Sequence, residues 1–426
     1  MKYHFAGKLV LESKRQVRFE IVDGRIFLPA SIEPAIASIK RGGILAGLID
    51  EGQYVEILFE HLYQVGFSYG LQSGKSTISR PHIEGFVKAC VVYNGPKPEP
   101  FDSICFFSSE ISKVIGYQVS ASFIREMAEI AGLEKRLGIY RKDGHEYILS
   151  IGFLRVDPTY RGQSLELKSD SNFTLNTAFD SYWVVKRLLT FLYQKRLVPL
   201  EGVYLKKEGK TVGQLFVEKP IPGQPSFLSP RCLSLLYLED KVDALLQAVA
   251  DGQLYLRHLP VFQEDESALT SGRFLMALVG LERVLSCFDS YGPTDTKNKA
   301  IQSAEQNLKQ LAAASSGYEK RIYKGFVGQL KKHDSLARRI ELALEDNTNK
   351  IANFFPLSSI GGDPAVIAQD LAEARNSFAH GDLDADLTIK NAQQMQLITL
   401  LILYLQLLLV GFDKTEASRI VPNLLF

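Results

Sequence analysis

The spacing of apolar residues changes along this chain of 426 residues, and the change falls at a segment rich in proline. Four prolines and one glycine crowd residues 220–230. Proline restricts φ and lacks a backbone N–H, so such a segment neither pairs within a sheet nor continues a helix. We therefore predict a linker at 220–230 that separates a domain at 1–219 from a domain at 231–426.

Before this linker the apolar residues follow the two-residue period of strands. Val17, Phe19 and Ile21 alternate with charged residues, which is the pattern of a half-buried strand. Three dipeptides suit tight hairpin turns: Asp23-Gly24, Asp143-Gly144 and Glu208-Gly209. One helix is expected at Thr177–Arg196, where an aromatic or arginine side chain recurs every four positions. The pattern predicts an antiparallel, β-rich and sandwich-like domain.

After the linker the spacing becomes helical. One stripe comprises Leu235, Leu238, Val242, Leu245 and Val249, and a second comprises Phe274, Leu278, Leu281, Leu285 and Phe288. The sequence therefore predicts an all-α bundle in this half and an α+β fold overall.

One apolar run near the end of the chain is a candidate for a membrane span. Leu397–Phe412 has 16 residues and contains Thr399 and Gln406. A helix needs about 20 apolar residues to cross a bilayer. We expect a buried core helix or dimer-interface helix here, and no membrane association.

The charges nearly cancel, with 49 Lys and Arg against 48 Asp and Glu, so binding to nucleic acid has to depend on a local patch. Residues 319–339 form such a patch, with two acidic residues and seven basic ones: Lys320, Arg321, Lys324, Lys331, Lys332, Arg338 and Arg339. Tyr318, Tyr323 and Phe326 are interleaved with them. The first five basic residues are candidates for binding an RNA backbone, and a solvated helix face is the alternative.

Cysteine and histidine spacing gives no sign of a metal site or a cofactor. The four cysteines lie far apart without a C-x-x-C pair, and His61 and His82 lack the spacing of metal ligands. Residues 1–10 lack the apolar stretch of a signal peptide. We expect a cytoplasmic protein with free thiols and no cofactor.

The segment with the most informative chemistry is 373–382, EARNSFAHGD. Pro364 suits the first turn of a helix that carries Arg375, and Gly381 suits its end. Arg375 and His380 then differ by about 140° around a regular helix, whereas Asn376 and His380 share a face. Two geometries would bring the arginine and histidine together: an unwound last turn, or a two-fold dimer in which each chain contributes its pair to one cleft.

The segment Arg375–His380 resembles the R-x(4–6)-H signature of HEPN domains, in which the first variable position, here Asn376, is often polar. The chain has no other Arg-to-His pair at that spacing. The segment Arg273–Leu285 is similar to the first long helix of the ApeA-like branch, and Asn391–Phe412 stands where its closing helix is expected. The resemblance covers Leu269–Phe412, and the β-rich half would correspond to the ApeA N-terminal domain.

This resemblance implies a metal-independent endoribonuclease that leaves a 2',3'-cyclic phosphate and a 5'-hydroxyl. Arg375 would bind the phosphate, and His380 would act as acid or base. Asn376 would orient the imidazole or hold a phosphate oxygen. Glu282 is a possible auxiliary residue, because a carboxylate on an apolar stripe needs a partner, for which Arg375 is the candidate. A purely structural ion pair is the alternative.

The resemblance also implies a biological setting. A homodimer that cuts tRNA or mRNA in anti-phage abortive infection would need restraint, and we expect the β-rich domain to bind a phage-derived trigger. Two alternatives remain open. The chain could be the toxin of a toxin–antitoxin pair, or a non-catalytic module that dimerises or binds a nucleotide or protein, in which Arg375 is a surface residue and His380 caps a helix.

Overall fold

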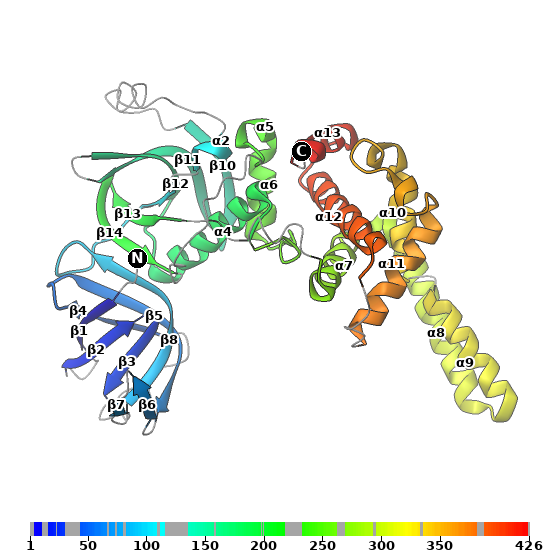
Figure 1. Ribbon diagram of the computed structural model, residues 1–426, viewed down its shortest axis with the longest axis horizontal. Coiled ribbons are helices and arrows are strands. Elements are labelled where there is room, and N and C mark those ends of the chain that lie inside the picture. Colours follow the sequence, from blue (N-terminus) through cyan, green and yellow to red (C-terminus); the bar gives the residue numbers. More distant parts are fainter. Residues whose placement is uncertain are drawn as a thin grey trace. The chain divides into compact units, whose positions relative to one another are not determined.

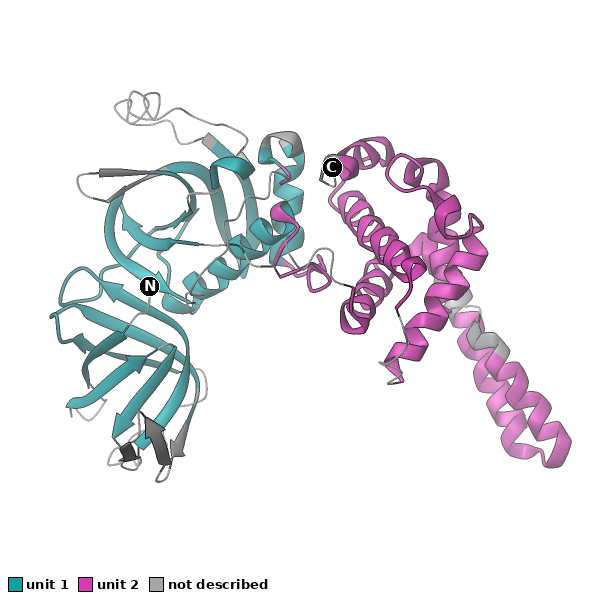
Figure 2. Ribbon diagram, viewed as in Figure 1, with its two compact units in different colours: residues 1–192, 198–228, 234–250 teal, residues 193–197, 229–233, 251–426 magenta. Residues whose placement is uncertain are grey.

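The computed structural model describes residues 4–10, 16–22, 24–29, 43–65, 68–72, 75–79, 82–108, 111–115, 135–156, 159–196, 198, 200–217, 232–261, 269–292, 295–332, 335–380 and 387–424. Two compact units are present (Figure 2). The strand unit comprises residues 1–192, 198–228 and 234–250, and the helical unit comprises 193–197, 229–233 and 251–426. The predicted α+β fold is confirmed. The predicted linker, 220–230, lies outside the described residues.

In the described part of the strand unit, one antiparallel sheet has twelve strands (Figure 1). They are β1 (His4–Val10), β2 (Gln16–Val22), β3 (Arg25–Pro29), β4 (Ile44–Ile49), β5 (Tyr54–Val65), β8 (His82–Tyr93), β9 (Ser103–Phe107), β10 (Lys135–Lys142), β11 (His145–Val156), β12 (Thr159–Ser169), β13 (Gly202–Lys207) and β14 (Lys210–Phe216). A separate hairpin is formed by β6 (Ser68–Gln72) and β7 (Lys75–Ser79).

The long strand β8 organises this sheet. Its first half pairs with β3 and its second half with β14, while its other edge pairs with β5. Because β5 continues through β4, β1 and β2 back to β3, six strands close on themselves. The interior holds the alternating apolar residues of these strands, including Phe19 and Ile21 on β2. The remaining strands extend from β14 to the edge strand β10.

The predicted hairpin turns are present where the structure describes them. Asp143 and Gly144 have φ of 53° and 82°, and Glu208 and Gly209 have φ of 50° and 79°. Positive φ at both central residues matches the right-handed twist of the flanking strands, which is why these dipeptides favour two-residue hairpins. Gly24 also has a positive φ, between β2 and β3, while Asp23 lies outside the described residues.

Helices cover the second part of the sheet. The predicted helix at Thr177–Arg196 is α4 (Leu175–Tyr193), and Tyr182 on α4 packs against Phe106 on β9. Four short elements also belong to this unit: α2 (Ile111–Ile115), α5 (Leu235–Leu238), η2 (Glu239–Lys241) and α6 (Val242–Ala250).

The packing of α6 differs from the expectation that all helices after residue 231 form one bundle. The apolar stripe at 235–249 is helical, as predicted, but α6 packs against β10. The backbone N–H of Ile139 donates to Asp243 at 2.8 Å, and that of Arg141 donates to Gln247 at 2.9 Å. The outer edge of an edge strand has backbone N–H groups with no neighbouring strand to accept their hydrogen bonds. Here side chains of α6 accept them.

The helical unit contains α7 (Ser271–Leu285), η4 (Asp289–Tyr291), α8 (Asp295–Ala314), α9 (Gly317–Lys332), α10 (Leu336–Ile351), η5 (Leu357–Ile360), α11 (Pro364–Ala379), α12 (Ile389–Leu409), α13 (Lys414–Ile420) and η6 (Val421–Leu424). Among the described helices, α12 alone is long and apolar enough to cross a membrane. However, 67% of its apolar window is buried inside the protein, as in the core helix of a soluble bundle.

A buried hydrogen-bond network fixes α10 against α12. Asn347 on α10 is 1% exposed. Its amide nitrogen donates to the Tyr291 hydroxyl at 2.8 Å, and its amide oxygen accepts from the Tyr404 hydroxyl at 3.0 Å. Tyr291 in turn donates to Asp346, which also pairs with Lys414. Because Tyr404 is fully buried on α12, this network specifies how the two helices align.

We predict that Asn347→Ala destabilises the helical unit by about 1–3 kcal/mol, because it leaves the Tyr404 hydroxyl buried without its acceptor. Urea unfolding followed by circular dichroism at 222 nm measures the change. The control is Asn307→Ala on the exposed face of α8, which should alter stability by less than about 0.5 kcal/mol. Equal effects of the two substitutions would contradict the role given to this network.

Candidate active site

The sequence signals around α11 explain its position. The Asp363 side chain accepts from the N–H of Ala365 at 2.9 Å, and Pro364 occupies the first turn, as predicted. One face of the helix is buried through Ile367, Ala368, Leu371 and Phe378. Phe378 meets Phe274 of α7 edge to face, with ring centroids 5.5 Å apart. These contacts fix α11 on α7 and leave its other face to solvent.

The end of α11 excludes one of the two geometries that would bring Arg375 and His380 together. The helix continues to Ala379, and the N–H of His380 donates to the carbonyl oxygens of Asn376 and Ser377 at 3.0 and 3.1 Å. The last turn is therefore not unwound between Arg375 and His380, and the two side chains leave the helix about 140° apart. Gly381, the predicted stop, lies outside the described residues.

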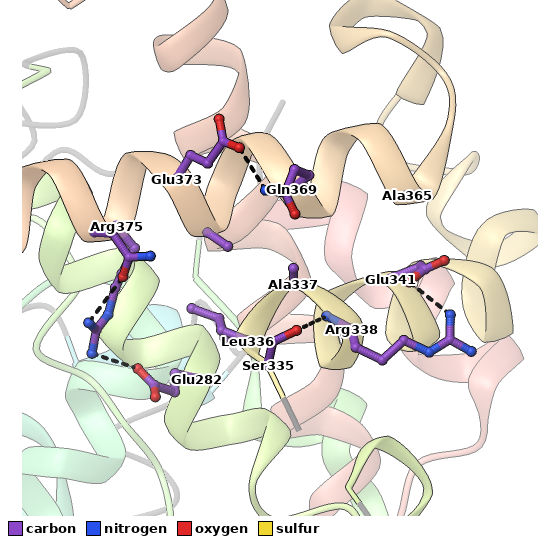
Figure 3. Close-up of a pocket in the computed structure, with 12 residues that line it drawn as sticks. Glu282, Ser335, Leu336, Ala337, Arg338, Glu341, Ala365, Gln369, Glu373 and Arg375 are labelled. Carbon is purple, nitrogen blue, oxygen red and sulfur yellow. Dashed lines mark hydrogen bonds and ion pairs between the residues drawn. The ribbon is translucent and has the colours of Figure 1, made fainter. Parts of the chain in front are cut away.

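Arg375 forms an ion pair with Glu282 of α7, at 3.5 Å (Figure 3). This is the pairing expected from the sequence. The Glu282 side chain is 40% exposed, however, so it borders the buried stripe of α7 and does not lie within it. Arg375 also approaches the amide oxygen of Asn376 at 3.5 Å. Since the Arg375 side chain is 35% exposed, its guanidinium remains accessible to an anion.

A cleft of about 690 Å³ opens beside Arg375, lined by residues of α7, α10 and α11. Arg338 on α10 pairs with Glu341 at 2.8 Å, and Gln369 on α11 donates to Glu373 at 2.6 Å. Figure 3 shows these pairs on different sides of the cleft from the Arg375–Glu282 pair. Asn376 lines the cleft, whereas His380 does not. One chain therefore brings Arg375, Asn376 and Glu282 together and holds His380 apart.

The described part of the helical unit has two histidines, and their environments are opposite. His258 is 3% exposed, and burial, with Arg273 and Arg196 nearby, lowers its pKa to about 3. It is therefore neutral and sealed from solvent at neutral pH. His380 is exposed at the end of α11. Only His380 of these two can reach a substrate.

The basic run at 319–339 is divided between two helices. Arg338 and Arg339 belong to α10, whereas the other five basic residues belong to α9, which pairs with α8 in a hairpin extending from the bundle (Figure 1). Lys320, Arg321 and Lys324 are exposed, with Glu319 the only acidic residue of α9. Lys331 and Lys332 are in the last turn, and their side chains lie outside the described residues.

The helical geometry of α9 separates the basic residues from the aromatic ones. At 100° per residue, the five basic positions fall within an arc of about 120°. Tyr318, Ile322 and Phe326 occupy the adjoining arc and are 78%, 43% and 49% exposed. Residues interleaved in the sequence thus form two neighbouring surfaces, one basic and one apolar. A polyanion with exposed rings or bases could contact both.

Sequence reasoning missed the cleft. Gln369, Glu373 and Glu341 have no role in the site predicted from the sequence, and Arg338 belongs only to the predicted basic run. A signal for part of it exists on α11, where Ala365, Gln369 and Ala372 precede Asn376 at spacings of three or four residues and so share its face. The contribution of α10 depends on a contact between distant segments, which no local pattern reveals.

No three His, Cys, Asp or Glu side chains gather as a metal site in the part of the chain that the structure describes. Comparisons of the chain with protein-family models, with curated proteins and with solved structures find no match. The roles of Arg375, Asn376, His380 and Glu282 therefore stay predictions.

Proposed function

We propose that this protein is a metal-independent endoribonuclease of the HEPN type, acting as a homodimer. One observation carries the proposal: the last turns of one regular helix expose Arg375, Asn376 and His380, with Arg375 and Asn376 lining a cleft and His380 on another side of the helix. Arginine offers a planar set of donors to a phosphate, and an imidazole can act as a general acid or base. These are the groups that RNA cleavage by the 2'-hydroxyl requires.

The proposed reaction needs two proton transfers. A neutral imidazole takes the proton of the 2'-hydroxyl, whose oxygen attacks phosphorus. The bond from phosphorus to the 5'-oxygen then breaks, and a protonated imidazole gives that oxygen its proton. Arg375 stabilises the charge that gathers on the phosphate oxygens. The products are a 2',3'-cyclic phosphate and a 5'-hydroxyl, and DNA is spared because it lacks the nucleophile.

A dimer resolves the divergence of Arg375 and His380. Because α11 is regular to its end, one chain does not direct both side chains at one phosphate. A two-fold axis near the end of α11 would place His380 of one copy opposite Arg375 of the other, giving two composite sites, in each of which the imidazole that takes the first proton can pass it to the leaving oxygen. The same surface would contain the Arg375–Glu282 pair, where the substrate phosphate competes with the carboxylate for the arginine.

Cleavage of total RNA in the presence of EDTA tests this proposal. We expect the wild-type protein to produce fragments with 2',3'-cyclic phosphate ends, and we expect Arg375→Ala and His380→Ala each to lower the rate by at least about 100-fold. Lys390→Ala, which removes an exposed ion pair with Asp370 of α11 outside the cleft lining, serves as the control and should leave the rate within about twofold. Cleavage that persists in both site variants would refute the assignment.

We also propose that the basic arc of α9 binds the RNA backbone. We expect Lys320→Gln, Arg321→Gln and Lys324→Gln together to weaken RNA binding. They should also reduce the slope of log K against log salt by about 2, since each lost phosphate contact contributes about 0.7 for a single strand. Lys8→Gln, Lys207→Gln and Lys210→Gln, an equal loss of charge on the strand unit, is the control. Equal slopes of log K against log salt for the two triple variants would show that α9 does not bind the RNA backbone.

We further propose that the strand unit keeps the rate of RNA cleavage low, though measurable, until it binds a trigger, as suits a cytoplasmic defence protein. A phage lysate that leaves the rate of RNA cleavage by the full-length chain unchanged would argue against this restraint.

A further inference from the structure

The cleft beside Arg375 has a lining that suits a flat ring with polar edges. Leu336, Ala337, Ala365 and Ala372 give it small apolar surfaces from α10 and α11. Its volume of about 690 Å³ falls within the range of roughly 300–1,000 Å³ that small-molecule sites occupy. The three alanines leave space where larger side chains would fill the cleft.

The polar groups of the cleft offer both donors and acceptors. The Arg338–Glu341 pair and the Gln369–Glu373 pair each present a donor beside a carboxylate. Nucleobases carry the same combination, with donors and acceptors on their edges and apolar faces above and below. A phosphate alone would leave the carboxylates unfavourably close to its charge. The mixed lining therefore favours a base over an isolated anion.

We infer that this cleft binds an unpaired nucleobase adjacent to the phosphate held by Arg375, which makes the substrate single-stranded RNA with a base preference at the cut. Arg375 and Asn376 line the same cleft, so a nucleotide whose phosphate meets Arg375 can extend its base toward Gln369 and Arg338. A paired base cannot enter, because its polar edge is already occupied and its faces are stacked. This inference rests on the proposed ribonuclease function for the identity of its ligand.

Calorimetric titration of the full-length protein in EDTA tests the inference without requiring cleavage. The probes are the 3'-monophosphates of adenosine, guanosine, cytidine and uridine, with ribose 5-phosphate as the probe that lacks a base. We expect at least one nucleotide to bind about tenfold or more tightly than ribose 5-phosphate, since stacking and edge contacts contribute about 1–3 kcal/mol. Four nucleotides that bind no better than ribose 5-phosphate would overturn the inference.

A matched pair of variants places the binding in this cleft. Ala365→Trp fills the cleft, whereas Val366→Trp adds the same ring at the next position, which is 49% exposed and does not line the cleft. We expect Ala365→Trp to abolish the advantage of the best nucleotide over ribose 5-phosphate, and Val366→Trp to keep it. Equal binding by the two variants would overturn the inference.

A milder substitution covers the case in which Ala365→Trp fails to fold. Gln369→Ala removes one polar group from the cleft and should weaken the best nucleotide about threefold or more, whereas Gln302→Ala on the exposed face of α8 should not. Cleavage of total RNA is measured separately. Nucleotide binding without cleavage would refute the proposed ribonuclease activity but not base binding in the cleft. Cleavage by a protein that binds the nucleotides no better than ribose 5-phosphate would refute base binding alone.

Discussion

The helical unit depends on the burial of α12 from Leu397 onward. Apolar residues cover all sides of this part of the helix, so every face of it has to be removed from water. α7 and α13 pack against it, and the polar groups that it brings inside are satisfied there, with Gln406 donating to the carbonyl of Tyr255 and Tyr404 to Asn347. α7 and α10, held in this way, form the support on which α11 packs. The outer face of α11 is left to solvent, and it carries the polar residues of the candidate site.

The regularity of α11 then limits the chemistry. A helix that keeps its hydrogen bonds through His380 directs Arg375 into the cleft and His380 elsewhere. A single chain thus presents Arg375 beside the carboxylate of Glu282, with the imidazole of His380 directed elsewhere. If two copies combine, each site is assembled from both chains, and activity depends on protein concentration. The ion pair with Glu282 holds the arginine at the edge of the cleft.

Local features of the fold were readable from the sequence, and long-range ones were not. The Asp143-Gly144 and Glu208-Gly209 turns, the start of α11 at Pro364 and the buried α12 all follow from the preferences of a few adjacent residues. The pairing of β5 with β8, which closes six strands, joins segments whose pairing no local pattern encodes. The packing of α6 on β10 likewise depends on contacts between distant segments. So does the contribution of α10 to the cleft. For the site, the sequence predicted the Arg375–Glu282 pair but not the cleft.

The most direct test of the composite site mixes two inactive variants. Arg375→Ala and His380→Ala proteins are unfolded and refolded together in equal amounts, and RNA cleavage in EDTA is compared with that of each variant refolded alone. If the arginine of one chain works with the histidine of the other, half of the dimers are mixed and one of their two sites is intact, so activity should recover to about a quarter of the wild-type level. A mixture that stays as inactive as its components, although mixed dimers have formed, would contradict the account.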